Sequence, residues 1–253
     1  MDKAKLLFKE FNKLEYVRFD FENPETFEKA IDNVDRVFLL RPPQIADVDR
    51  YIKPLVLKMR EKQVNEIVFL SVQGAEKSKV IPHNKIERLV KESGLSYIFL
   101  RPSYFMQNLT TTLLNDIKIK GKIILPAGKA KFNWIDIRNI GEAAAILLNQ
   151  FTEHLNQTIE ITGYENANFY TAAKLISTSI NKRITYQSLN PIAFYRLKKS
   201  EGVATGFIIV VIMLHFIPRL QKEPKISQSF EQLTGRKPNT LAEFIEREKQ
   251  LFG

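Results

Sequence analysis

The sequence predicts an α/β fold built on a parallel sheet, followed by a smaller α+β lobe. Short apolar runs typical of strands alternate with segments whose apolar residues recur at helical spacing. The strand-like runs are continuously apolar, which indicates strands buried on both faces of a parallel sheet. With 253 residues, 44% of them hydrophobic, the chain is long enough to bury such a core.

The predicted elements can be placed by their apolar pattern and their end signals. Gly94 follows one helical segment where a left-handed residue ends a helix, and Pro102 removes a ladder donor after a strand. The predicted strands are Tyr16–Asp20, Arg36–Leu40, Glu66–Ser71 and Tyr97–Arg101, then Thr158–Thr162 and Ile184–Tyr186. The predicted helices are Glu25–Ile31, Asp47–Lys62, His83–Ser93 and Phe169–Ile180, together with an Ala-rich helix that Asp136–Asn139 lead into and that ends near Leu148.

Composition excludes several kinds of chemistry. Cysteine is absent, so disulfides, thiolate metal sites and cysteine nucleophiles are excluded. Only three histidines occur and none forms a helical HxxxH pair, so we expect no metal site. The opening MDKAKLLFKEF is too charged for a signal peptide, and we expect a cytoplasmic protein.

The net charge of +10 raises the question of an anionic partner. The basic residues are scattered and interleaved with acids, and no helix-turn-helix, zinc-finger or RNP-type motif accompanies them. We therefore expect a Lys-rich solvated surface with some attraction for phosphorylated cofactors, and no specific nucleic-acid binding.

One apolar segment bears on membrane association. Phe207–Leu214, FIIVVIML, is uncharged, but a membrane-spanning helix needs about 20 apolar residues and Pro218 closes this segment early. We expect a buried helix or a partner interface and no membrane partner. An exposed apolar patch of this kind would suit dimerisation or an apolar substrate pocket.

Four segments carry a family resemblance. Within His83–Leu109, the residues His83, Glu87, Ser93-Gly94-Leu95, Leu100-Arg101-Pro102, Phe105-Met106 and Asn108 follow the pattern H…E, sGl, lRP, fm and N. The other segments are Val34–Pro43 (VDRVFLLRPP), Glu66–Ala75 (EIVFLSVQGA) and Ser229–Phe252 with its LTGR-P-T-eFi pattern. Together they resemble the NmrA-like group of atypical short-chain dehydrogenase/reductases. The resemblance implies a Rossmann-like sheet and a cofactor that is NADP or NAD.

The start of the chain departs from that family pattern. Family members open with a strand, a GxxGxxG turn, a helix and a second strand, whereas none of the 253 residues forms a GxxGxxG. The opening residues resemble the segment after that second strand. We therefore expect an N-terminally reduced Rossmann-like sheet that binds dinucleotides weakly. The expected division is a partial NAD(P)-binding domain over residues 1–108 and a substrate or lid lobe over residues 109–253.

The resemblance also implies cofactor-binding residues at the carboxyl ends of the strands. Asp20 and Phe21 would meet the adenine, although Asp20 fits equally a residue that caps a turn. Leu40, Arg41 and Pro42 end a strand; Arg41 is suited to a phosphate, and the alternative is a surface arginine. Ser71 would lie near the nicotinamide ribose, but serine at a strand end is common.

His83 is the candidate catalytic residue. The resemblance places His83 near the lysine of the usual Tyr-x-x-x-Lys pair, and the position four residues earlier is Lys79 instead of a tyrosine. His83 would bind the nicotinamide ribose or act as an acid, since its ordinary pKa is near 6.5; the alternative is a surface histidine at a helix start. Tyr104, Phe105 and Asn108 would line the nicotinamide or substrate pocket, or Phe105 would only pack the lobe.

Two functions of different classes follow. The first is an NAD(P)H-dependent reductase of a small carbonyl or quinone-type acceptor. The second is a non-catalytic cofactor sensor or protein-interaction regulator, or an inactive truncated remnant, which the missing Tyr and Gly-rich turn favour. The expected partner is a small-molecule substrate, with a homodimer or a protein partner left open.

Overall fold

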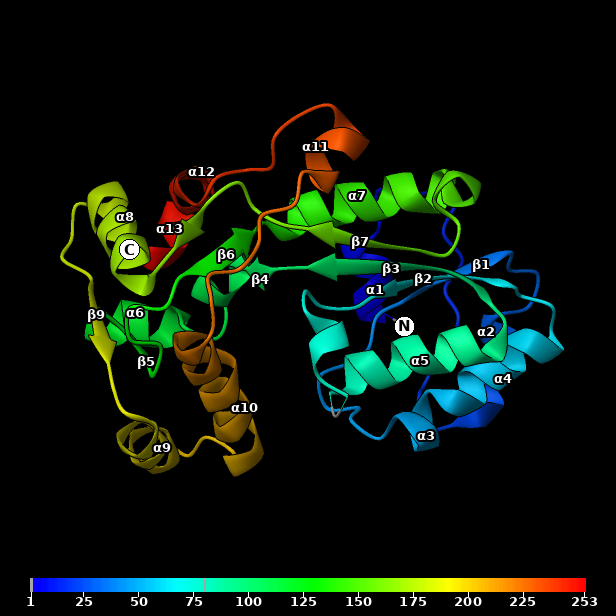
Figure 1. Cartoon of the computed structure of the whole chain (residues 1–253), viewed down its shortest axis with the longest axis horizontal. Helices are drawn as coiled ribbons and strands as arrows, with labels where there is room; N and C mark the ends of the chain where they lie inside the picture. Colours follow the sequence, from blue (N-terminus) through cyan, green and yellow to red (C-terminus); the bar gives the residue numbers. More distant parts are fainter. Residues whose placement is uncertain (1, 80) are drawn as a thin grey trace. The chain divides into compact units, whose positions relative to one another are not determined.

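The computed structural model describes residues 2–79 and 81–253 (Figure 1). The chain forms two compact units. The first contains the residues up to Arg101 together with Ala144–Ile159, and the second contains Pro102–Ala143 and Glu160–Gly253. The division predicted after residue 108 differs from this because the chain returns to the first unit in the second half of one helix and the strand that follows.

The first unit is organised by a four-stranded sheet. Its strands, in spatial order, are β1 (Arg36–Leu39), β2 (Glu66–Leu70), β3 (Ser96–Pro102) and β7 (Gln157–Ile161). β1 pairs with β2 and β2 with β3 in parallel, with Leu39 opposite Phe69 and Phe69 opposite Phe99. The α/β class and the parallel sheet predicted from the continuous apolar runs are confirmed.

The first unit also contains short helices, several of which contribute to the core around this sheet. They are α1 (Asp2–Leu7), η1 (Pro24–Thr26), α2 (Phe27–Ala30), α3 (Val48–Tyr51), α4 (Lys53–Glu61), η2 (Ala75–Lys77), α5 (Pro82–Ser93) and η4 (Phe151–His154). Val56, Met59 and Val90 from these helices are buried with Phe69 and Phe99 of the sheet. The single helix predicted over 47–62 is two helices, because a proline in the first turn of α4 has no N–H to continue the preceding helix.

The strand predicted over Tyr16–Asp20 is wrong: this segment is not a strand in the described part of the chain. At its end the chain bonds locally instead, because the Asp20 N–H donates to the Thr26 hydroxyl at 3.0 Å. Phe19 stacks on Phe27 with ring centroids 5.3 Å apart, so its side chain packs on α2. The apolar character that suggested a strand therefore serves side-chain packing.

The second unit is an α+β lobe with two small sheets. Its first part contains β4 (Tyr104–Phe105), η3 (Met106–Leu109), α6 (Leu114–Lys120), β5 (Lys122–Leu125), β6 (Phe132–Ile135) and the start of α7 (Ile137–Asn149). Its second part contains β8 (Asn166–Ala167), α8 (Phe169–Ile180), β9 (Thr185–Ser188), α9 (Pro191–Ser200), α10 (Thr205–Phe216), η5 (Ile217–Leu220), α11 (Ser229–Thr234), α12 (Leu241–Arg247) and α13 (Lys249–Phe252). The sheets have the orders β4-β6-β8 and β5-β9. The helix predicted over Phe169–Ile180 has those bounds in the structure.

Candidate functional site

The loop after β1 is organised by Arg41. Its Nη1 donates to the carbonyls of Pro42, Pro43 and Ile45 at 2.8, 3.1 and 2.7 Å. Its Nε is buried and has no hydrogen-bond partner among the residues that the structure describes. Burial lowers the pKa of the guanidinium, which stays a cation at neutral pH. Leu40 beside it is exposed. The loop therefore holds a positive charge with one unsatisfied N–H at the carboxyl end of a parallel strand.

His83 lies at the start of α5, next to this charge. Its ring stacks on Phe69 of β2, with centroids 6.1 Å apart. Burial and then the positive charge of Arg41 lower the pKa of His83 to about 4, against a smaller opposing effect of Glu87. The imidazole is therefore neutral at physiological pH. His83 and Arg41, which were both selected from the sequence, are therefore close enough to interact electrostatically.

Ser71 belongs to a buried ionic network. Its hydroxyl donates to Glu87 Oε1 at 2.6 Å, and Arg101 donates to both oxygens of Glu87 at 2.9 Å from Nε and 2.6 Å from Nη2. Arg101 also binds Glu76 at 2.5 Å. Sequence reasoning assigned no role to Glu87 or Arg101 beyond the family pattern. Two features of the sequence could have indicated this pair: Glu87 follows His83 by one helical turn, and Arg101 lies at the end of an apolar strand.

Asp20 and Phe21 lie in the segment before α2. Asp20 is exposed, and its Oδ1 accepts a hydrogen bond of 2.9 Å from the Glu22 N–H, as a residue that caps a turn does. Phe21 is half-buried and meets Phe19 edge-on at 4.8 Å. Contact of these two residues with an adenine ring stays a prediction.

Tyr104 and Asn108 come together in the second unit. His215 Nδ1 lies 2.7 Å from the carbonyl of Val211 and must donate to it, so its Nε2 accepts from the Tyr104 hydroxyl at 2.9 Å. Burial lowers the pKa of His215 to about 4. Burial also raises the pKa of Tyr104, against an opposing hydrogen bond with the Asn108 side chain. Phe105 is half-buried on β4, and its role in a pocket stays a prediction.

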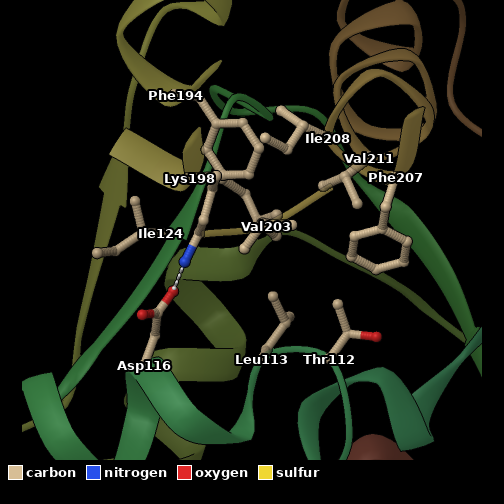
Figure 2. A pocket seen from close by; sticks show the side chains of 11 residues that line it. Thr112, Leu113, Asp116, Ile124, Phe194, Lys198, Val203, Phe207, Ile208 and Val211 are labelled. Atoms are coloured by element: carbon tan, nitrogen blue, oxygen red, sulfur yellow. Dashed lines mark hydrogen bonds and ion pairs between the residues drawn. The ribbon is translucent and has the colours of Figure 1, made fainter. Parts of the chain in front are cut away.

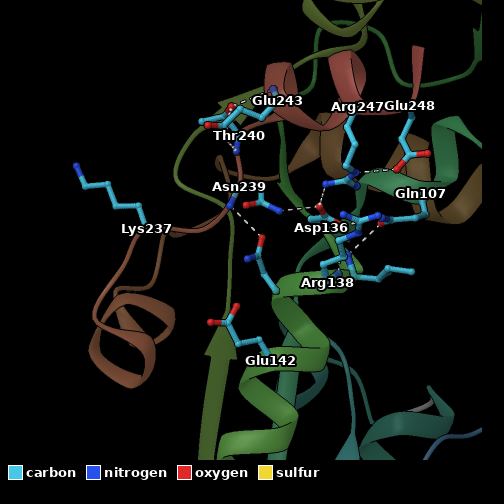
Figure 3. Close-up of polar contacts among 12 residues, drawn as sticks. Gln107, Asp136, Arg138, Glu142, Lys237, Asn239, Thr240, Glu243, Arg247 and Glu248 are labelled. Carbon is cyan, nitrogen blue, oxygen red and sulfur yellow. Dashed lines mark hydrogen bonds and ion pairs between the residues drawn. The ribbon is translucent and has the colours of Figure 1, made fainter. Parts of the chain in front are cut away.

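Asp136, at the N-terminus of α7, collects donors from distant segments (Figure 3). The fully buried carboxylate accepts from Gln107 at 2.7 Å, Asn239 at 2.9 Å, Arg247 at 2.7 Å and the Arg138 N–H at 3.1 Å. Burial alone would raise the pKa of Asp136, but hydrogen bonds from Arg247, Asn239 and Gln107 outweigh it and hold the pKa at about 2. The carboxylate therefore fixes η3 and α12 to the start of α7.

A cavity of about 80 Å³ lies in the second unit (Figure 2). It is lined by Thr112, Leu113, Asp116, Ile124, Leu125, Phe194, Lys198, Val203, Phe207, Ile208 and Val211. The Lys198 ammonium pairs with Asp116 at 2.5 Å, so the charged groups at the cavity are mutually neutralised. The volume is well below the roughly 300 Å³ of small ligand sites, so the cavity holds a small group at most. Among the described residues no acidic or histidine cluster suits a metal ion.

The parallel sheet with polar residues after its strands, followed by an α+β unit, defines a Rossmann-like α/β protein. A model of the NmrA-like family matches residues 3–245, and the chain belongs to this family. The resemblance deduced from the four segments is thereby confirmed.

Individual relatives agree with this assignment. Prestalk A differentiation protein A of Dictyostelium discoideum is 31% identical over 90% of this chain and 75% of its own length. An NAD(P)H azoreductase of Xenophilus azovorans is 25% identical over 92% of this chain and 82% of its own. A crystal structure of an NADPH-dependent quinone oxidoreductase of Escherichia coli with NADPH superposes with a TM-score of 0.86 and 19% identity, over 96% of this chain and 87% of that one. The last comparison shows a shared fold.

Proposed function

We propose that this chain is an NAD(P)H-dependent reductase of a small carbonyl or quinone-type acceptor. It binds NADP or NAD at the carboxyl ends of β1 and β2. The observation that carries the proposal is the cation of Arg41, with its unsatisfied buried Nε, beside the neutral ring of His83. Similarity to an azoreductase and a quinone oxidoreductase, both named for NAD(P)H or NADPH, supports the reaction class.

The unsatisfied polar atoms fit a dinucleotide. Buried donors and acceptors in proteins are normally paired, so an orphan points to a missing partner. The Nε of Arg41 would donate to a phosphate or ribose oxygen. Asn84, next to His83, donates from its Nδ2 to the Ala75 carbonyl at 3.1 Å. Its buried Oδ1 has no partner within residues 2–79 and 81–253, so this oxygen would accept from a ribose hydroxyl or carboxamide.

When bound, the nicotinamide supplies a hydride, and a proton from solvent completes the two-electron reduction of the acceptor. His83, with a pKa of about 4, offers one N–H and one lone pair, so ribose binding is favoured over a role as cationic acid. The Ser71 hydroxyl donates its hydrogen bond to Glu87, so its oxygen lone pairs remain available to accept from a ribose hydroxyl. In the second unit, Tyr104, Phe105 and Asn108 would contact the acceptor.

A second candidate is a regulator that senses the dinucleotide without turnover. It is favoured by Lys79 at the position of the family's tyrosine acid and by the absence of a GxxGxxG from the 253 residues. The similarity to a protein named for differentiation agrees with it. Both candidates require dinucleotide binding, and they differ in whether an acceptor is reduced.

Titration of the 253-residue chain with NADPH and NADH, followed by nicotinamide fluorescence, tests the binding. Without a Gly-rich turn we expect a dissociation constant of roughly 0.1–1 mM, which corresponds to about 4–5.5 kcal/mol. Arg41→Met should raise it about tenfold or more, because a charge-assisted hydrogen bond contributes about 1.5–3 kcal/mol. Arg41→Lys should give an intermediate loss, since the charge stays. Arg50→Met, at an exposed arginine on α3, is the matched control and should bind as the wild type.

Oxidation of NADPH in the presence of quinone, azo and aldehyde acceptors then separates the two candidates. Acceptor-dependent turnover supports the reductase. Binding without turnover of any acceptor supports the sensor. A folded wild-type chain that binds neither dinucleotide at millimolar concentration, or equal binding by the Arg41→Met and Arg50→Met variants, overturns the proposed site.

A further inference from the structure

Helix α10 is apolar around its whole circumference but only half covered. One side contributes Ile208, Val211 and His215 to the interior. The other side consists of Phe207, Ile209, Val210, Met213 and Leu214, each 47–59% exposed, continued by the exposed Ile217. At 3.6 residues per turn these six positions form one arc of roughly 160°. This set of six residues is called the α10 apolar face.

Such a face is unusual on a surface. A helix that is hydrophobic on all sides is normally buried, and large exposed apolar patches mark interaction sites. The α10 apolar face has no charged or hydrogen-bonding side chain among its six residues. Protein–protein interfaces carry about one hydrogen bond per 100–200 Å², whereas the acyl region of a bilayer requires none.

The charges around the face select an anionic partner. Between residues 191 and 226 the chain has six basic residues against two acidic ones, a net charge of +4. The basic residues precede and follow α10 in the sequence and are Arg196, Lys198, Lys199, Arg219, Lys222 and Lys225. Lys198 is already paired with Asp116 and Glu201, so the exposed residues Arg196, Lys199, Arg219 and Lys222 carry the argument for an anionic partner. The acids are engaged: Glu201 binds Lys120 and Lys198, and Glu223 binds Lys131. Two copies meeting through this face would bring two such positive regions together, which opposes a dimer.

The dimensions suit a helix lying in the plane of a membrane surface. Twelve residues span about 18 Å, too short to cross a hydrocarbon core of about 30 Å. Accordingly, no helix among the described residues is long and apolar enough to span a membrane. Interfacial helices sink about 5–10 Å into the headgroup–acyl boundary, which is about the exposed half of a helix 10–12 Å across. The sequence predicts no membrane partner because the segment is too short to span a bilayer. That argument does not exclude a helix that lies on the membrane surface.

We propose that the α10 apolar face docks on an anionic lipid bilayer, with its side chains at the acyl boundary and the flanking basic residues among the headgroups. Apolar insertion and cation attraction together are the two signals that stable peripheral binding needs. This surface is independent of the dinucleotide site proposed above. It would hold the protein where apolar acceptors dissolve.

Vesicle co-sedimentation tests the proposal with phosphatidylcholine vesicles that contain or lack phosphatidylserine. The wild type should bind the anionic vesicles and lose binding as salt rises, because surface charges are screened. Val210→Asp/Met213→Asp should lower the partition coefficient at least tenfold. The matched control Leu57→Asp/Ile119→Asp changes two exposed aliphatic residues on α4 and α6 and should bind as the wild type. Circular dichroism checks that each variant is folded.

A site-specific probe locates the inserted surface. Because the chain has no cysteine, Leu214→Cys can be labelled alone with an environment-sensitive dye, and Leu57→Cys serves as its control. A blue shift on anionic vesicles is expected for the label at 214 and not at 57. The proposal is overturned if the folded wild type does not bind the anionic vesicles. It is also overturned if Val210→Asp/Met213→Asp leaves vesicle binding unchanged and only converts a dimer to a monomer in sedimentation equilibrium. The first result would leave an acidic protein as the partner of this face, and the second a second copy.

Discussion

The substitution Glu87→Gln should strongly destabilise the first unit. Glu87 is a carboxylate with a side chain 5% exposed that accepts three hydrogen bonds, two from Arg101 and one from Ser71. An amide of the same shape removes the negative charge and turns an N–H₂ group toward the guanidinium, which can only donate. Arg101, 10% exposed, would then be a buried cation next to a neutral amide, while its bond to the half-exposed Glu76 remains.

The magnitude follows from burial. Removing one partner of a buried ion pair costs about 3–5 kcal/mol, and the surviving bond to Glu76 favours the lower end, about 3 kcal/mol. For a chain of this length that corresponds to a fall in melting temperature of roughly 6–12 °C. The matched control is Glu92→Gln on the same helix. Its partner Arg88 lies 3.6 Å away, both side chains are 60–69% exposed, and the loss should stay below about 0.5 kcal/mol.

Urea unfolding followed by circular dichroism measures both variants, with the slope checked against the wild type so that the free energies are comparable. A loss below about 1 kcal/mol for Glu87→Gln, or equal losses for the two variants, would refute the argument. It would mean that water or a shifted Arg101 replaces the carboxylate, and that the network does not hold α5 to β3.

Two further outcomes are expected. The pKa values of His83 and His215 are about 4 in the folded chain, against 6.5 ordinarily. Between these two pH values the unfolded chain binds more protons than the folded chain. The free energy of unfolding should therefore fall as the pH is lowered from about 6.5 to about 4. The midpoints of urea unfolding across this pH range should show the fall, and His215→Gln should reduce the pH dependence. A wild-type midpoint that does not change with pH would contradict the burial of both histidines. Asp136→Asn should cost about 3 kcal/mol, because Arg247 loses its buried carboxylate, whereas Glu246→Gln at an exposed pair should be near neutral. Similar urea midpoints for these two variants would contradict the role of Asp136 in holding η3 and α12 to the start of α7.

Local signals predicted most of the fold. β2 and β3 were predicted because continuous apolar runs are typical of buried parallel strands. The helix α8 was predicted with its observed bounds, and the structure adds that the Asn168 side chain accepts from the Thr171 N–H at its start. Tyr16–Asp20 failed because a strand needs a ladder partner, and pairing is not encoded in the segment itself. Its apolar residues serve packing on α2.

The candidate site was predicted less completely, for the same physical reason. Arg41, Ser71 and His83 were selected from the family resemblance and from their places at a strand end or a helix start, and their binding roles stay predictions. His215 was missed as the partner of Tyr104 because 111 residues separate them, and its own segment looks only apolar. Asp136 was seen as part of a helix start, but its bond to Arg247 joins residues equally far apart in sequence. Such pairs are decided by the tertiary fold.

Glu87 and Asp136 have the same structural role in their two units. Each is a buried carboxylate that accepts donors from separate segments: Glu87 from a strand end and the next strand, Asp136 from η3 and the C-terminal region. A buried carboxylate is tolerated only when its oxygens are satisfied, so each one fixes the segments around it. Glu87 lies one turn from His83 and holds Ser71, so it positions the proposed dinucleotide residues without needing to touch the ligand. A change at Glu87 should therefore weaken NADPH binding as well as stability, whereas the same change at Asp136 should act on the second unit.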